Sequence, residues 1–152
     1  MKRTLLWVFI ALASGALLGK LTFDRYDNLN IKQVANLDEK VYMLKYGSYS
    51  SEDDMSNKLK DIDRYIYIEE DGNYSVYLAI TKTLDNANKI LNLYTLKNIK
   101  LEIEKLSIDN EEFISNLNEY EKLLSATEDE KSLLIIQRQI LACYTSLVVE
   151  DE

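Results

Sequence analysis

The sequence predicts an α+β fold of the split βαβ type. In this fold a four-stranded antiparallel sheet carries two helices on one face and leaves the other face uncovered. Three observations predict it: short runs with strand composition, helix caps that follow two of these runs, and the turn dipeptide Asp71-Gly72 between two others. A strand-then-helix pattern also occurs twice, since Leu44 and Ser51 correspond in spacing to Val76 and Thr83.

The first half of the domain is predicted as one strand and one helix. Residues 41–49 are rich in Val, Tyr and Leu, which favours a strand. Ser51 is followed three positions later by Asp54, which is the spacing of a capping box, so a helix begins there. Its apolar stripe is formed by Met55, Leu59 and Ile62.

The second half repeats this order after a hairpin. Residues 65–68 and 74–80 are predicted strands, and Asp71-Gly72 between them is a hairpin signal. Thr83 can cap a second helix, and alternation over 99–103 predicts the last strand. The core face of the second helix is formed by Ala87, Ile90, Leu91 and Tyr94.

Two further helices are predicted after the sheet, over residues 108–152. The first has Phe113, Leu117 and Leu124 in register, and the second begins at Thr127 with Glu130 in capping-box spacing. The second is too apolar for a free helix, so it packs on the first or on the helical side of the domain. A helix of a partner protein is the alternative occupant.

An N-terminal membrane anchor is predicted over residues 1–23. Residues 4–19 carry no charge, and Lys2 and Arg3 precede them, which favours a single-pass signal-anchor in the cell membrane with its N-terminus in the cytoplasm. A cleaved signal peptide is the alternative, because small residues stand at cleavage-site spacing. Both place the later residues outside the membrane, with residues 24–40 as a polar tether.

Composition excludes several classes of function. The 152 residues include no histidine and one cysteine, Cys143, which removes histidine-based catalytic triads and the usual zinc, haem and disulfide sites. We expect no cofactor and no metal, and we expect Cys143 to be buried. A net charge of -8 disfavours nucleic acid and anionic lipid and favours a neutral partner.

Residues 41–107 resemble the SPOR domain, the sporulation-related repeat of bacterial envelope proteins. The resemblance is carried by the run from Val41 to Tyr49, the run from Tyr74 to Thr81, and the helix that follows each. Lys45 stands where the family commonly has glutamine, and Ala79 replaces a glycine. The anchor and C-terminal helices are similar to small membrane-bound members from low-GC Gram-positive bacteria. The resemblance implies binding to peptidoglycan glycan strands without stem peptides, at sites of cell division or sporulation.

Alternation along the strands predicts which side chains lie on the uncovered face. Tyrosines favour sugar contacts because the ring is rigid and apolar and the hydroxyl is polar. We expect Tyr67 and Tyr77 to lie on adjacent strands and stack on sugar rings, with Lys45 as a hydrogen-bond donor. Cross-strand pairing of tyrosines in an ordinary sheet is the alternative. The predicted glycan-binding residues are Met43, Lys45, Tyr65, Tyr67, Ser75 and Tyr77, and the same face should carry Lys100 and Glu102.

These observations predict a non-catalytic protein that is anchored in the membrane and binds peptidoglycan through residues 41–107. The alternative is an envelope adaptor that has lost glycan binding and recruits a division or sporulation protein. A wall hydrolase is the weakest hypothesis, because no nucleophile, metal set or acid/base pair stands out. The acidic runs, such as 52–54 and 69–71, fit helix starts and turns.

Overall fold

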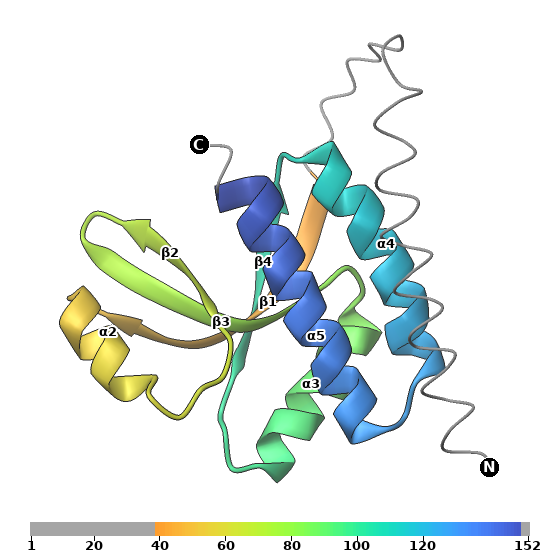
Figure 1. Ribbon diagram of the computed structural model, residues 1–152, viewed down its shortest axis with the longest axis horizontal. Coiled ribbons are helices and arrows are strands. Elements are labelled where there is room, and N and C mark those ends of the chain that lie inside the picture. Colours follow the sequence, from red (N-terminus) through yellow and green to blue (C-terminus); the bar gives the residue numbers. More distant parts are fainter. Residues whose placement is uncertain (1–38, 150–152) are drawn as a thin grey trace, which may run out of the picture. The chain divides into compact units, whose positions relative to one another are not determined.

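A four-stranded antiparallel sheet forms the centre of the domain in the computed structural model, which describes residues 39–149 (Figure 1). Its strands lie in the order β2-β3-β1-β4, and each neighbouring pair is antiparallel. The predicted α+β class and four-stranded sheet are therefore confirmed. The predicted anchor, and the tether up to residue 38, lie outside the described residues. The strands are β1 (Glu39–Tyr49), β2 (Ile66–Glu70), β3 (Asn73–Thr81) and β4 (Glu102–Ile108).

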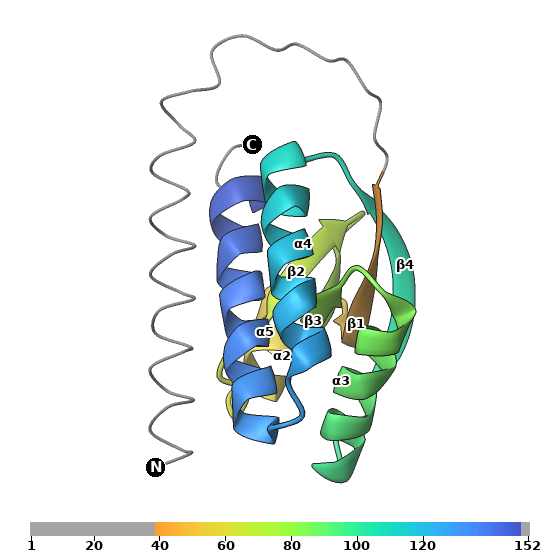
Figure 2. The same ribbon diagram turned by 90° about the vertical axis from the view of Figure 1, so that its right-hand side faces the viewer.

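Within residues 39–149 four α-helices surround the sheet. Helix α2 connects β1 to β2, and α3 connects β3 to β4. Helices α4 and α5 follow the last strand and pack side by side as an antiparallel hairpin (Figure 2). The helices are α2 (Glu52–Lys58), α3 (Leu84–Leu96), α4 (Glu111–Ala126) and α5 (Glu130–Tyr144), which continues into a π-helical turn, η1 (Thr145–Val149).

The predicted helix caps are confirmed at two of three positions. The Ser51 hydroxyl accepts a hydrogen bond from the Asp54 N–H at 3.2 Å, and the Thr83 hydroxyl accepts one from the Asn86 N–H at 3.3 Å. The predicted start of the last helix at Thr127 is wrong, because Thr127 ends α4. Asp129 caps α5 instead, and its carboxylate accepts from the Ser132 N–H at 3.0 Å.

The β2–β3 hairpin closes through the predicted Asp71-Gly72 turn. Both residues have positive φ angles, 50° for Asp71 and 76° for Gly72. A two-residue turn whose twist matches that of the flanking strands requires this conformation. The last strand differs from its prediction, since it begins at Glu102 rather than at Ile99. Asn98 has φ 59°, and the Ile99 N–H donates to the Tyr94 carbonyl, so these residues end α3 before β4 can begin.

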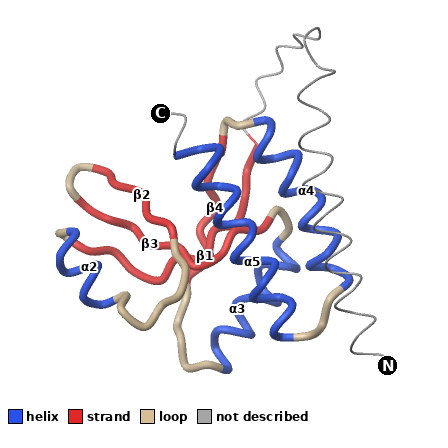
Figure 3. The backbone as a smooth tube through the Cα atoms, viewed as in Figure 1, coloured by secondary structure: helices blue, strands red, loops and turns tan. Residues whose placement is uncertain are grey.

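Strand β1 bends near its middle, where its pairing with β3 is irregular (Figure 3). Leu44 pairs with Ala79 and Lys45 with Tyr77, which leaves one extra residue in β3; the next pair skips one residue in β1. Such irregularities increase local twist and bend a strand. Strand β1 pairs with β4 only up to Lys45, whereas its pairing with β3 runs from Tyr42 to Tyr49.

Both faces of the sheet are covered along the second part of β3. All residues from Val76 to Thr81 are buried, and successive side chains of a strand point to opposite faces. The prediction that one face of the sheet is uncovered is therefore wrong over this stretch. Helix α3 contacts β1, β3 and β4, and α5 also contacts β3. The C-terminal hairpin thus supplies the additional cover, and the described residues 39–149 belong to one compact unit.

The stretch Glu130–Val149 is long and apolar enough to cross a membrane by length and composition alone. Its inward side, however, belongs to the core of the domain, where Ile140 and Leu141 are almost completely buried. This is the pattern of a core helix that packs against a sheet.

Candidate functional site

The register of the hairpin places Tyr67 and Tyr77 on opposite faces of the sheet. Tyr67 lies opposite Val76, and Ile66 lies opposite Tyr77. Directly paired residues of antiparallel strands share a face, and adjacent residues of one strand do not. The prediction that Tyr67 and Tyr77 form one binding surface is therefore wrong.

Tyr77 lies in a partly buried polar network with Lys45 and Glu104, which we call the Lys45 network. The Tyr77 hydroxyl donates to Glu104 Oε2 at 2.8 Å, and Lys45 Nζ donates to Glu104 Oε1 at 3.0 Å. Tyr77 is only 3% exposed, and Met43, which pairs with Glu104, is 1% exposed. The expected exposure of Met43 and Tyr77 is therefore wrong. Lys45, which was predicted to donate a hydrogen bond to the glycan, donates to Glu104 within the sheet.

The network shifts the pKa values of its members. Burial, and then the hydrogen bond to Glu104, raise the pKa of Tyr77 far above its ordinary value, so its hydroxyl stays a donor. Burial raises the pKa of Glu104, but the hydrogen bonds from Tyr77 and Lys45 have the larger combined effect and lower this pKa below 4.5. The three groups therefore act as a cross-strand tie between β3, β1 and β4.

We predict that this tie makes the domain sensitive to acid. Because the folded pKa of Glu104 lies below the unfolded value of 4.5, its stabilisation is complete above that value and is lost as the pH falls through the folded pKa. The Glu104→Gln variant should lose about 1 kcal/mol of stability at pH 7, and the difference from wild type should shrink below pH 4.5. Urea unfolding at both pH values measures this; a constant difference would contradict it.

The opposite face carries three tyrosines at the end of the hairpin, which we call the tyrosine face: Tyr49, Tyr67 and Tyr74. Tyr49 pairs with Tyr74 across β1 and β3, and the rings of Tyr74 and Tyr67 lie 5.8 Å apart at an interplanar angle of 60°. Tyr67 is 43% exposed, while Tyr49 and Tyr74 are partly buried. The three residues span three adjacent strands.

Gly47 makes room for this arrangement. A Cβ atom at Gly47 would lie 3.3 Å from the Tyr49 hydroxyl oxygen, which is a tight contact. Gly47 also directly follows the irregular pairing in β1, which is where a glycine in a strand often marks a bulge or a close approach.

Carboxylates surround the tyrosine face. Glu69 pairs with Tyr74 and stands two residues after Tyr67, so it shares their face. Burial raises the pKa of Tyr74, and the charges of Glu69 and Glu52 raise it further. Burial also raises the pKa of Tyr49, with smaller contributions from Tyr46 and Asp54. Both hydroxyls therefore remain neutral donors beside negative groups.

The other predicted site residues do not join this face. Tyr65 precedes β2 and is partly buried. Ser75 shares the face of Tyr77, and its hydroxyl lies 3.3 Å from that of Ser48. Lys100 precedes β4, and Glu102 pairs with Lys45. The prediction missed Tyr49 and Tyr74; the two-residue turn at Asp71-Gly72 contained the signal for Tyr74, whereas Tyr49 depends on the irregular pairing of β1 with β3.

The C-terminal hairpin caps the edge of β3 where that strand extends beyond β2. The Ile80 N–H donates to Gln137 Oε1 at 3.1 Å, and the Lys82 N–H donates to Glu121 Oε1 at 2.7 Å. The pairing of β2 with β3 ends at Tyr77, so these donors have no β2 partner. Side chains from α5 and α4 satisfy them instead.

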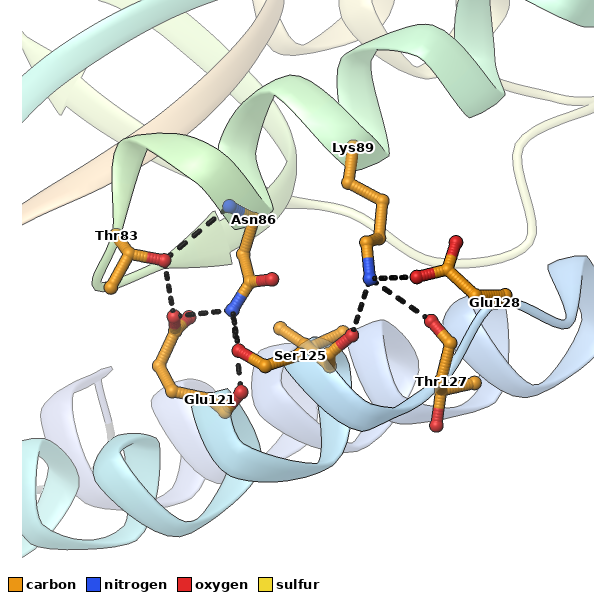
Figure 4. A network of polar contacts seen from close by, with 8 residues as sticks. Thr83, Asn86, Lys89, Glu121, Ser125, Thr127 and Glu128 are labelled. Carbon is orange, nitrogen blue, oxygen red and sulfur yellow. Dashed lines mark hydrogen bonds and ion pairs between the residues drawn. The ribbon is translucent and has the colours of Figure 1, made fainter.

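Glu121 and Lys89 connect α3 to α4 (Figure 4). The Glu121 carboxylate is buried and also accepts from the Thr83 hydroxyl at 2.9 Å and from Asn86 Nδ2 at 2.7 Å. Lys89 Nζ donates to the carbonyls of Leu124 and Thr127 at the end of α4, at 3.0 and 3.1 Å. These contacts make the hairpin an integral part of the domain.

Two further features of the described part of the chain concern metal binding and the cysteine. Residues 39–149 contain no group of three or more His, Cys, Asp or Glu residues placed to bind a metal. Cys143 is partly buried, and burial raises the pKa of its thiol, although Asn116 Nδ2 lies 3.7 Å from the sulfur. The thiol is therefore a poor nucleophile at neutral pH.

Comparison of the chain with models of protein families, with curated proteins and with solved structures gave no match.

Proposed function

We propose that this chain is a non-catalytic, membrane-anchored protein of the bacterial envelope that binds peptidoglycan glycan strands through its tyrosine face. The observation that carries the proposal is the exposed ring of Tyr67 beside Tyr74. The order of elements and the strand order β2-β3-β1-β4 support it, because they are those of the split βαβ arrangement that the SPOR resemblance implies.

The proposed mechanism is localisation. A sugar ring stacks on the exposed face of Tyr67, and the hydroxyls of the tyrosine face hydrogen-bond to polar groups of the glycan. The N-terminal segment stays in the cell membrane with its N-terminus in the cytoplasm, and the domain lies outside. The polar tether holds the domain within roughly 50 Å of the membrane. The ligand is then wall material near the membrane, at division or sporulation sites.

The first test of this function is sedimentation of the full-length chain, in mild detergent, with purified peptidoglycan. We expect more protein in the pellet after an amidase has removed the stem peptides. Equal sedimentation before and after amidase treatment would contradict recognition of the bare glycan.

We predict that Tyr67→Ala weakens this binding by about 1 kcal/mol, because the substitution removes the exposed ring. Tyr67→Phe keeps the ring and should cost less. Leu96→Ala, a change at an exposed apolar residue on α3, is the control and should leave sedimentation unchanged. Normal sedimentation of a folded Tyr67→Ala variant would exclude the contact.

A second function, an adaptor for an envelope protein, is favoured by one observation on the C-terminal hairpin. Leu134 and Ile135 of α5 are partly exposed, and Val149 at the end of η1 is 51% exposed. These apolar side chains suit a partner helix. If the wild-type chain sediments with neither peptidoglycan preparation, the adaptor function is favoured instead.

A further inference from the structure

The tyrosine face holds a carboxylate next to the exposed ring of Tyr67 and the partly buried ring of Tyr74. Glu69 lies directly opposite Tyr74, and Tyr67 lies two residues before Glu69 on the same strand and face. The ring centroids of Tyr67 and Tyr74 are 5.8 Å apart. Glu69 is exposed, so the carboxylate and the ring of Tyr67 can contact one ligand together.

The negative charge at this position has no basic partner. Among the ion pairs within residues 39–149, none involves Glu69 or Glu52. On the opposite face the situation differs, since Glu104 is paired with Lys45. The tyrosine face therefore offers uncompensated negative charge to a ligand, in a chain whose net charge is -8.

We infer that the tyrosine face prefers glycan strands whose amino sugars carry a free ammonium group over fully N-acetylated strands; this inference rests on the proposed function. An amino sugar has an apolar ring face that stacks on Tyr67 and a cationic group that reaches the carboxylate of Glu69. Acetylation of the nitrogen removes the charge while leaving the ring unchanged. The carboxylate is then the residue that sets specificity, and the ring supplies the common part of the affinity.

The inference is tested by isothermal titration calorimetry of the full-length chain in mild detergent. The probes are glucosamine and N-acetylglucosamine oligosaccharides of equal length, at a pH where the free amine is protonated. We expect the glucosamine oligosaccharide to bind about fivefold more tightly. Tyr67→Ala should weaken the binding of both sugars.

Two matched variants separate the local carboxylate from the general field of the protein. Glu69→Gln should abolish the preference. Glu70→Gln makes the same change of charge one residue later, where the side chain belongs to the opposite face, and should keep the preference. Melting curves of both variants verify that they are folded.

Four results would overturn the inference. Equal affinity of the wild type for the two sugars would do so and would leave the proposed glycan binding intact. Equal loss of preference in Glu69→Gln and Glu70→Gln would show that general charge attraction is sufficient. Competition by tri-lysine as strong as by the glucosamine oligosaccharide would show recognition of charge without the sugar. Binding of neither sugar, together with no sedimentation on peptidoglycan, would overturn the proposed function as well.

Discussion

A chain that ends after Ser107 is expected to lose cooperative folding. Removing α4 and α5 exposes β3 and deletes a set of buried side chains, each of which contributes about 1.5–3 kcal/mol by burial. Their sum exceeds the total stability of a typical domain, about 5–15 kcal/mol. The deleted buried apolar residues are Ile108, Phe113, Ile114, Leu117, Leu124, Leu133, Ile136, Ile140, Leu141 and Tyr144.

The measurement is urea unfolding followed by near-ultraviolet circular dichroism. The control is a chain that ends after Val149, which retains both helices and should unfold in one sigmoidal transition. If the chain ending after Ser107 gives a sigmoidal transition at a similar urea concentration, the hairpin is an appendage. In that case residues 41–107 form the independent domain that the SPOR resemblance implies.

The substitution Glu121→Ala should have the second largest effect, a loss of about 3 kcal/mol. Glu121 is only 7% exposed, and its carboxylate accepts hydrogen bonds from the Lys82 N–H, the Thr83 hydroxyl and Asn86 Nδ2. Buried donors left without acceptors cost about 1–3 kcal/mol each, although water that enters the new space can recover part of this.

Two further variants complete the measurement of unfolding free energy. Glu121→Gln retains one acceptor oxygen and should fall between Ala and wild type. Glu112→Ala, on the exposed side of the same helix, should change stability by less than about 1 kcal/mol. A loss below about 1 kcal/mol for Glu121→Ala would show that water replaces the carboxylate without cost.

Local sequence signals predicted the elements well, because they act over a few residues. Ser51 and Thr83 cap the helices that they were predicted to cap, and Asp71-Gly72 forms the predicted turn. The signals failed where two of them competed. Thr127 and Asp129 can both cap a helix, and Asp129 does so while Thr127 ends the preceding helix.

The faces of the sheet were predictable in part, and the error in the site has a specific cause. A two-residue turn that pairs Glu70 with Asn73 sets odd-numbered residues of β2 opposite even-numbered residues of β3. Tyr67 and Tyr77 are both odd and must lie on opposite faces. Alternation taken along each strand separately does not contain this constraint, whereas the turn length does.

Other features depend on long-range packing that no local pattern encodes. The burial of Met43 and Tyr77 requires a cover over the second face of the sheet, to which the C-terminal hairpin contributes. The roles of Glu121 and Gln137 likewise depend on where α4 and α5 dock against β3. A buried acidic residue and a buried glutamine look like ordinary helix-surface residues in sequence.

The edge contacts of β3 also set an order of events during synthesis. Ile80 and its acceptor Gln137 are separated by 57 positions in the chain, so the strand emerges from the ribosome long before the side chain that protects its edge. Until then the unpaired donors of β3 are open to pairing with another nascent chain. Protection of this edge by Gln137 therefore waits for the last helix. Slow translation before residue 137 would therefore prolong the exposure of this edge.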